Sequence, residues 1–333
     1  MPQILVQDLA KTYRVAERDP GVLGAMRGLV HRRWRTVEAL TGVSFSLERG
    51  ELLGFIGPNG AGKSTTIKIL SGILRPDSGR VEVDGLVPWQ DRIRHVARIG
   101  VVFGQRTQLW WDLSVGDGFD LLRDIYRVDP TRYRTTRDEL VALLRLEKIL
   151  DQPVRQLSLG QRMRAEIAAA MLHEPQVLFL DEPTIGLDAP SKLAVREFVK
   201  RLNRERGVTV LLTTHDMHDI EALAERVIVI GHGRVLADSP FETLRTEVLR
   251  ERRLFVDFAD EAPELDLRAL PGVTVRARAG RALELAFDPL RTSAPALITA
   301  ITARHAVDDI HVEQPAIEEV IARFYDLHGA GEA

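Results

Sequence analysis

The segment from Gly57 to Ser64 constrains the fold of this chain more than any other. It follows the apolar run Leu52–Ile56, precedes the apolar-periodic stretch Thr65–Leu70, and fits the pattern G-x-x-x-x-G-K-[ST]. Glycines let successive backbone N–H groups face one centre, and the following helix adds the positive end of its dipole. We therefore predict a strand, a phosphate-binding loop and a helix. The alternative is a glycine-rich turn that binds nothing.

This loop predicts a nucleotide site in which two side chains have defined roles. Lys63 is expected to reach the β- and γ-phosphates, and Ser64 to offer its hydroxyl to Mg²⁺. The other residues expected to contact the nucleotide are Gly57, Pro58, Asn59, Gly60, Ala61, Gly62 and Thr65. The motif predicts that a nucleotide binds, but not what the nucleotide is used for.

Composition excludes several classes of protein. The chain of 333 residues contains no cysteine, so disulfides and thiolate metal sites are excluded. A net charge of −3 argues against a protein built around nucleic-acid binding. No apolar run approaches the roughly 20 residues that a membrane span needs, and the N-terminus lacks signal-peptide character. We expect a soluble, cytoplasmic chain whose role at a membrane would depend on a partner.

The pattern of apolar residues predicts a parallel sheet with a helical insertion. Continuous apolar runs at Val177–Leu180 and Val208–Thr213 are typical of buried parallel strands. Helical periodicity begins at about Val115, and a capped helix is expected at Leu159–His173, which places a helical insertion at about residues 115–172.

Both ends of the chain add further segments. Near the N-terminus we expect two short strands, Ile4–Val6 and Leu40–Leu47, separated by an irregular basic insertion over about residues 15–36. After Pro240 the sequence contains several strand-like apolar runs and two helical segments, which predict a separate domain. The expected domains are therefore residues 1–240 and an accessory α+β domain at residues 241–333.

Two adjacent carboxylates end the predicted strand at Val177–Leu180. In parallel sheets, ligands bind at the carboxyl ends of the strands. Asp181 is suitably placed there to hold Mg²⁺ through water, and Glu182 to polarise a water molecule for attack on the γ-phosphate. The alternative is a solvated turn before Pro183.

A second anion site is predicted at the start of the helix at Leu159–His173. Ser158 and Gln161 have the spacing of a capping box, which by itself indicates only a well-capped helix. A helix start that contains Gly160 also offers free N–H groups to an anion. Because the first loop already serves one nucleotide, a second phosphate-facing helix is expected to serve a nucleotide held by another subunit.

Together these motifs resemble those of the ATP-binding-cassette (ABC) ATPases over about residues 3–240. The motifs occur in the family's order and approximate spacing: the phosphate loop, Gln105, Leu157-Ser158-Leu159-Gly160-Gln161, Asp181-Glu182-Pro183, Leu187-Asp188 and His215. The resemblance implies an α/β fold, with a P-loop NTPase core, an antiparallel β subdomain, a helical insertion and a small C-terminal α+β domain. It also implies ATP and Mg²⁺ as ligands, and a head-to-tail dimer of cassettes that holds two ATP molecules.

The resemblance also implies roles for individual residues. Gln105 would contact Mg²⁺ and the attacking water, and His215 the γ-phosphate. Asp188 would lie in the loop that spans the dimer. The γ-phosphate held by the other subunit would be contacted by Ser158, Gly160 and Gln161. Tyr13 looks like the aromatic residue that stacks on adenine. The alternatives are a solvated amide for Gln105, a helix start for His215 and an ordinary strand tyrosine for Tyr13.

Several features depart from the common family pattern or point to a subgroup. Leu159 replaces the usual glycine, so its side chain must point away from the nucleotide. The stretch after Gln105, with Trp110 and Trp111, resembles cassettes that serve ABC-2-type permeases, which are mostly exporters. The two tryptophans are expected either to contact a permease or to pack under the helical insertion. The basic stretch at residues 24–36 suggests contact with anionic lipid or a permease, or else a solvated loop.

The sequence therefore predicts the ATP-hydrolysing subunit of a membrane transporter, with separate permease subunits and a second cassette, expected to be a copy of this chain. It would lie on the cytoplasmic face of the membrane through the permease. The C-terminal domain is expected to serve dimerisation or regulation, or simply to pack on the cassette. A soluble cassette acting on ribosomes or nucleic acid is the main alternative, and no nucleic-acid partner is expected. A small-molecule kinase would leave the Ser158 motif and His215 unexplained.

Overall fold

The computed structural model describes residues 2–17, 33–104, 106–214, 216–248, 251–267, 270–313 and 317–327. The chain divides after Pro240 into two compact units. The first unit carries every motif discussed above. Gln105, His215 and most of the basic stretch at residues 24–36 lie outside the described residues.

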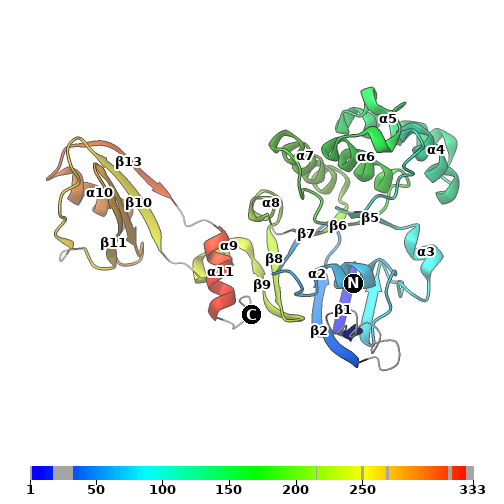
Figure 1. The fold of residues 1–333 in the computed structure, drawn as a ribbon, viewed down its shortest axis with the longest axis horizontal. Coiled ribbons are helices and arrows are strands. Elements are labelled where there is room, and N and C mark those ends of the chain that lie inside the picture. The colour runs from blue at the N-terminus through cyan, green and yellow to red at the C-terminus, as the bar shows by residue number, and fades with distance from the viewer. Residues whose placement is uncertain are drawn as a thin grey trace, which may run out of the picture. The chain divides into compact units, whose positions relative to one another are not determined.

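A six-stranded sheet forms the centre of the first unit (Figure 1). Its order is β5 (Ile99–Phe103), β6 (Val177–Asp181), β7 (Thr209–Thr213), β3 (Leu52–Ile56), β8 (Arg226–Gly231) and β9 (Arg234–Pro240). The first five strands are parallel, and β9 pairs with β8 in the antiparallel sense. Every residue of β3, β6 and β7 is buried, which explains their continuous apolar sequences.

The helices of this unit connect the parallel strands and form the helical insertion. They are α2 (Lys63–Leu70), α3 (Arg92–Val96), α4 (Val115–Tyr126), α5 (Pro130–Leu144), α6 (Leu159–Met171), α7 (Ala189–Arg206) and α8 (Met217–Leu223). Two short 3₁₀ turns, Glu147–Ile149 and Val154–Gln156, lead from α5 to α6. The insertion helices α4 to α6 lie at the upper right of Figure 1, on the side of β5 and β6. The structure confirms the predicted helix after the phosphate loop, the helical insertion and the helix that begins at Leu159, whereas no sequence pattern predicted α3.

The N-terminal strands are much longer than expected. β1 (Ile4–Glu17) and β2 (Arg33–Leu47) form an antiparallel pair, and β4 (Ser78–Val83) pairs with the other side of β1. The prediction of an irregular stretch over residues 15–36 is therefore wrong for its described ends, where Val15 pairs with Arg35 and Ala16 with Trp34. These residues are exposed in a two-stranded ribbon, so they lack the alternating apolar pattern that marks a half-buried strand.

The second unit is built on a four-stranded antiparallel sheet. Its order is β11 (Val273–Ala279), β12 (Ala282–Phe287), β10 (Arg252–Phe258) and β13 (Val307–Glu313). Helix α10 (Ala294–Thr302) packs Leu297 and Ile301 against one face of this sheet. Helices α9 (Phe241–Val248) and α11 (Ile317–Leu327) pack against each other. The predicted fold class, a P-loop α/β core with an additional α+β domain, is confirmed.

Candidate nucleotide site

The phosphate-binding loop joins β3 to α2 and places Lys63 in the first turn of that helix. Gly62 forms the N-cap with no side-chain cap, so the first N–H groups of α2 have no capping side chain. Its φ of 108° and the proximity of the Ala39 carbonyl, 2.6 Å from where a Cβ would lie, both require glycine at this position. The helix start is therefore open to an anion, as the motif predicts.

Lys63 is buried within the curve of this loop. Its Nζ donates hydrogen bonds to the carbonyl oxygens of Gly57, at 2.6 Å, and Pro58, at 3.0 Å. Burial lowers the pKa of Lys63, while the negative charges of Glu182 and Asp181 oppose that shift. A buried ammonium group that donates to two backbone carbonyls, near two carboxylates, is suited to meet the phosphates of a nucleotide.

Asp181 lies at the carboxyl end of β6, where it accepts hydrogen bonds from two hydroxyl groups. Its Oδ1 accepts hydrogen bonds from the hydroxyl groups of Ser64, at 3.1 Å, and Thr213, at 2.7 Å. A serine hydroxyl and a carboxylate are oxygen ligands of the kind Mg²⁺ prefers. The residues present therefore fit Mg²⁺ bound between Ser64 and Asp181. Sequence reasoning missed Thr213, although a threonine that ends a buried apolar strand beside Asp181 could have signalled it.

Glu182 follows Asp181 with its backbone in an uncommon conformation. Its φ is 54°, in the left-handed region that non-glycine residues rarely adopt. Its N–H donates to the carbonyl of Thr213 at 2.9 Å. Gly104 lies so close to the Glu182 backbone that a Cβ at position 104 would be 2.1 Å from the Glu182 carbonyl oxygen. Such local strain occurs at functional sites. Sequence reasoning missed Gly104, whose position at the end of β5 was the available signal.

Ser158 and Gln161 form the predicted capping box at the start of α6. The Gln161 N–H donates to Ser158 Oγ at 3.3 Å, and the Ser158 N–H donates to Gln161 Oε1 at 2.9 Å. The side chain of Leu159 extends toward Gly186 of the same chain, where a Cβ would lie 3.0 Å from Leu159 Cδ2. The capping box at the start of α6 therefore forms although Leu159 replaces the usual glycine.

Gly160 lies beside the start of α7 in the same chain. A Cβ at Gly160 would lie 2.3 Å from Ser191 Oγ and 3.7 Å from Asp188 Oδ1. Asp188 caps α7 by accepting a hydrogen bond from the Ser191 N–H at 3.1 Å, and the hydrogen bonds from Ser191 lower the pKa of Asp188. The structure therefore brings the Ser158 motif and Asp188 together on one surface.

No described hydrogen bond or ion pair links that surface to the phosphate loop. Within the described residues, no hydrogen bond or ion pair joins Ser158, Gly160, Gln161 or Asp188 to the segment Gly57–Thr65. The predicted contacts thus form two separate groups in one chain.

Tyr13 lies on β1 opposite Val37 of β2. Its ring is partly buried, with Lys11 Nζ 5.9 Å from the ring centre. The partial exposure of the ring leaves its use as an adenine platform a prediction.

A buried polar network joins Thr184 to Thr214, the residue that precedes His215 in the sequence; His215 itself lies outside the described residues. The Asp219 carboxylate, fully buried on α8, accepts hydrogen bonds from Thr184 and from Thr214 at 3.2 Å. Arg196 of α7 donates to Asp219 Oδ1 at 2.5 Å. These contacts tie the turn after Glu182 to the residue before His215. Sequence reasoning missed Asp219 because its spacing carries no motif.

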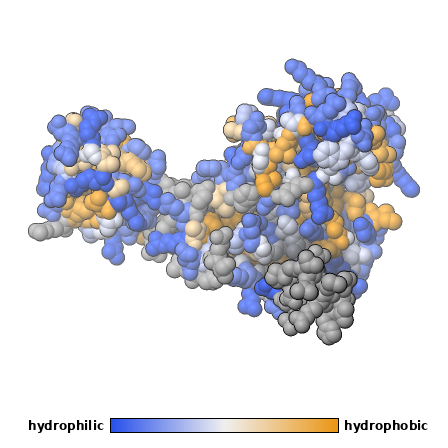
Figure 2. Space-filling view, viewed as in Figure 1, coloured by the Kyte–Doolittle hydropathy of each residue, from blue (hydrophilic) through white to orange (hydrophobic). Residues whose placement is uncertain are grey.

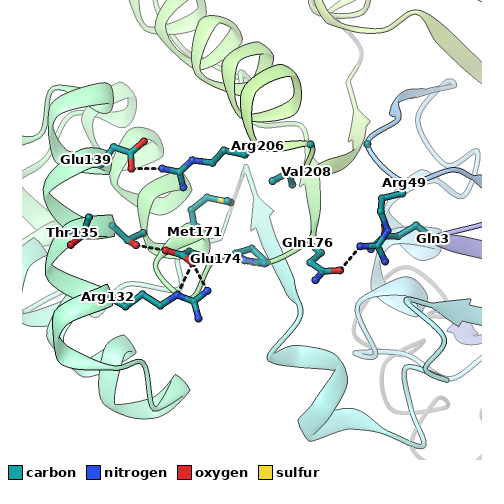
Figure 3. Close-up of a pocket in the computed structure, with 14 residues that line it drawn as sticks. Gln3, Arg49, Arg132, Thr135, Glu139, Met171, Glu174, Gln176, Arg206 and Val208 are labelled. Atoms are coloured by element: carbon teal, nitrogen blue, oxygen red, sulfur yellow. Dashed lines mark hydrogen bonds and ion pairs between the residues drawn. The ribbon is translucent and has the colours of Figure 1, made fainter.

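A cavity in the described part of the chain lies away from this site (Figure 3). It has a volume of about 900 Å³ and adjoins the amino ends of β6 and β7, at Gln176 and Val208. Figure 3 shows its charged side chains in pairs, Arg132 with Glu174 and Arg206 with Glu139. Arg49 also lines the cavity and pairs with Asp84, so each charged side chain of the described lining already has a partner of opposite charge.

The two adjacent tryptophans after Gln105 lie at the surface. Trp110 is 40% exposed and Trp111 is 52% exposed, which excludes the alternative that both rings are packed under the insertion. Leu121 and Ile125 of α4 are also exposed. Figure 2 shows orange apolar patches among hydrophilic residues over the insertion helices at the upper right. Exposed large apolar side chains of this kind are typical of contact surfaces.

Comparison with known proteins identifies the family. Residues 40–185 match the family model described as ABC transporter. The daunorubicin resistance ATP-binding protein DrrA3 of Streptomyces coeruleorubidus is 34% identical over 306 residues, which cover 90% of this chain and 94% of the relative. The Nod factor export ATP-binding protein I of Ralstonia nicotianae is 32% identical and matches 88% of this chain and 91% of its own length.

Other matches cover about two thirds to three quarters of this chain. A probable sulfate/thiosulfate import ATP-binding protein of Chlorella vulgaris is 33% identical, over 66% of this chain and 96% of its own length. A solved dimeric structure of the ATP-binding cassette MJ0796, in a post-hydrolysis state bound to ADP and Pi, has a TM-score of 0.59 at 27% identity. That match covers 71% of this chain and 98% of the cassette. No helix in the described ranges is long and apolar enough to cross a membrane.

Proposed function

The chain belongs to the ABC transporter family of ATP-binding proteins, which hydrolyse ATP with Mg²⁺, and we propose that it energises export through a separate permease. The observation that carries this proposal is the division of the site into two surfaces. Lys63, Ser64, Asp181 and Glu182 form one surface, and the Ser158 motif with Asp188 forms the other. A second cassette placed head to tail would complete each site.

In the proposed reaction, Lys63 binds the β- and γ-phosphates, and Glu182 polarises the water that attacks the γ-phosphate. Ser64 and Asp181 are the residues that would hold Mg²⁺, which neutralises phosphate charge when bound. The partner's copy of the Ser158 motif offers N–H groups and a helix dipole to the γ-phosphate. Because neither half-site is complete alone, interactions with the γ-phosphate form only on closure, and hydrolysis removes the group that holds the halves together.

Export is supported by relatives that match nearly the whole chain. Two relatives that match about nine tenths of this chain are a resistance protein and a Nod factor export protein. The second unit is therefore part of what this chain shares with the export relative. The exposed Trp110–Trp111 segment supports contact with an ABC-2-type permease, which would hold the chain at the cytoplasmic face of the membrane.

Two experiments test this proposal. Affinity purification of the tagged chain from membranes should recover a permease, whereas recovery of ribosomes would support a soluble cassette instead. The variant Glu182→Gln should form a dimer with saturating Mg-ATP that is absent without nucleotide. A variant that stays monomeric under those conditions would contradict the proposed cycle.

A further inference from the structure

A buried carboxylate in the middle of α6 has no part in the nucleotide site. Glu166 is only 3% exposed and lies two turns after the helix start at Ser158. Its side chain makes no ion pair within the described residues. A buried carboxylate is costly unless hydrogen bonds satisfy it, so its partners indicate why it is there.

Among the described residues, every hydrogen-bond donor to its side chain belongs to one loop, the segment that follows Gln105. The Thr107 hydroxyl and the Leu109 N–H, the latter at 3.5 Å, donate to Glu166 Oε1. The Gln108 N–H donates to Oε2 at 3.0 Å, and the Gln108 side-chain amide donates to the Glu166 backbone carbonyl at 2.9 Å. Three successive residues are thus fastened to one side chain. Burial raises the pKa of Glu166, and these hydrogen bonds oppose the shift.

The fastened loop carries the exposed tryptophans. Leu109 is buried and anchors the loop just before Trp110 and Trp111. Arg162, one turn before Glu166 on α6, lies with its guanidinium 5.7 Å from the centre of the Trp111 ring, within reach of a cation–π interaction. Helix α6 therefore contacts the loop at two places, through the Glu166 carboxylate and through the Arg162 guanidinium.

We propose that Glu166 is a positioning residue that locks the loop Arg106–Asp112 onto α6, so that the start of α6 and the exposed tryptophans move as one body. Glu166 lies about 12 Å along the helix axis from the start of α6, eight residues at 1.5 Å each. A change at the γ-phosphate end is then transmitted to the permease-facing end without a flexible link. This inference rests on the proposed function, since it assigns a role to the same surface.

Hydrogen exchange in the purified chain measures directly how firmly Glu166 holds the loop Arg106–Asp112. In Glu166→Gln the side chain keeps its size, but its NH₂ group faces a loop N–H or hydroxyl donor that needs an acceptor. Exchange at the amides of Gln108 and Leu109 should accelerate about tenfold or more, as expected for the loss of a charged hydrogen bond. Glu174→Gln is the matched control, because Glu174 also accepts a hydrogen bond from a threonine hydroxyl, that of Thr136.

The threonine partner gives an independent pair of variants. Thr107→Val removes the hydroxyl at nearly constant volume and should also accelerate exchange in the loop. Thr107→Ser keeps the hydroxyl and should restore protection. Unchanged exchange in Glu166→Gln, or equal acceleration in Glu174→Gln, would overturn the positioning role.

The functional measurement uses the chain co-purified with its membrane components. Basal ATPase activity and the KM for ATP of the chain alone should be unchanged in Glu166→Gln, because no contact with nucleotide is lost. Stimulation of that activity by the membrane components should fall at least about tenfold, in line with the loosened loop. Full stimulation of a variant whose loop exchanges faster would overturn the inference. A wild-type chain that its co-purified components never stimulate would overturn the proposed function itself.

Discussion

Acid should weaken the attachment of the helical insertion to the central sheet through one histidine. His173, just after α6, has its Nε2 2.9 Å from the Ile99 carbonyl at the start of β5. Its ring stacks on Tyr126 of α4, with ring centres 4.0 Å apart. Its Nδ1 is buried and has no hydrogen-bond partner among the described residues. A proton added there would place a charge in a site with no acceptor for it.

Burial lowers the pKa of His173 to about 4, against an opposing effect of the hydrogen bond with Ile99. The unfolded chain, with an ordinary histidine pKa near 6.5, therefore binds a proton more readily than the folded chain. The contribution of neutral His173 to stability is complete above about pH 6.5 and is lost as the pH falls toward 4. Between pH 7.5 and pH 5 the expected loss is about 2 kcal/mol.

Urea unfolding at these two pH values measures this loss. All four tryptophans precede residue 112, so their fluorescence reports on the first unit alone. His173→Gln keeps an N–H donor for the Ile99 carbonyl but does not titrate. Its free energy of unfolding should fall between pH 7.5 and pH 5 by about 2 kcal/mol less than that of the wild type. Other titrating groups, including buried His95, are common to both proteins and cancel. Equal losses in both proteins would refute the reasoning.

Three further predictions concern the nucleotide site. Gly104→Ala should lower kcat for ATP by about 10²-fold with ATP binding retained, since its Cβ would displace the Glu182 backbone; a normal kcat would contradict this. Lys63→Ala should weaken ATP binding about 10- to 100-fold in equilibrium titrations, because buried charged hydrogen bonds to phosphate are lost; an unchanged Kd would exclude that role. Chelation of Mg²⁺ should stop hydrolysis reversibly, and Ser64→Ala should raise the Mg²⁺ concentration needed to restore it, whereas an unchanged requirement would remove Ser64 from the metal site.

The core of the first unit could be predicted because its residues are constrained locally. The strands at Val177–Asp181 and Thr209–Thr213 are buried on both faces, so only continuous apolar sequences fit them. The capping box at Ser158 and Gln161 formed as its spacing predicts. The long ribbon of β1 and β2 could not be predicted in the same way. Beyond Lys11 its described strands pair only with each other, and from Arg14 onward β1 is exposed, so no burial pattern marks this part of the ribbon.

The sequence by itself determined the chemistry of this protein, because a phosphate loop, a carboxylate pair and a capped helix need only neighbouring residues in fixed order. Lys63, Asp181 and Ser158 could each be named without knowing what surrounds them. Only the tertiary structure decided how these groups combine. It placed Ser64 and Thr213 on Asp181, held Gly104 against Glu182, and fastened the loop after Gln105 to Glu166. Those contacts join residues up to 117 positions apart, and such distances leave no periodic trace in a sequence.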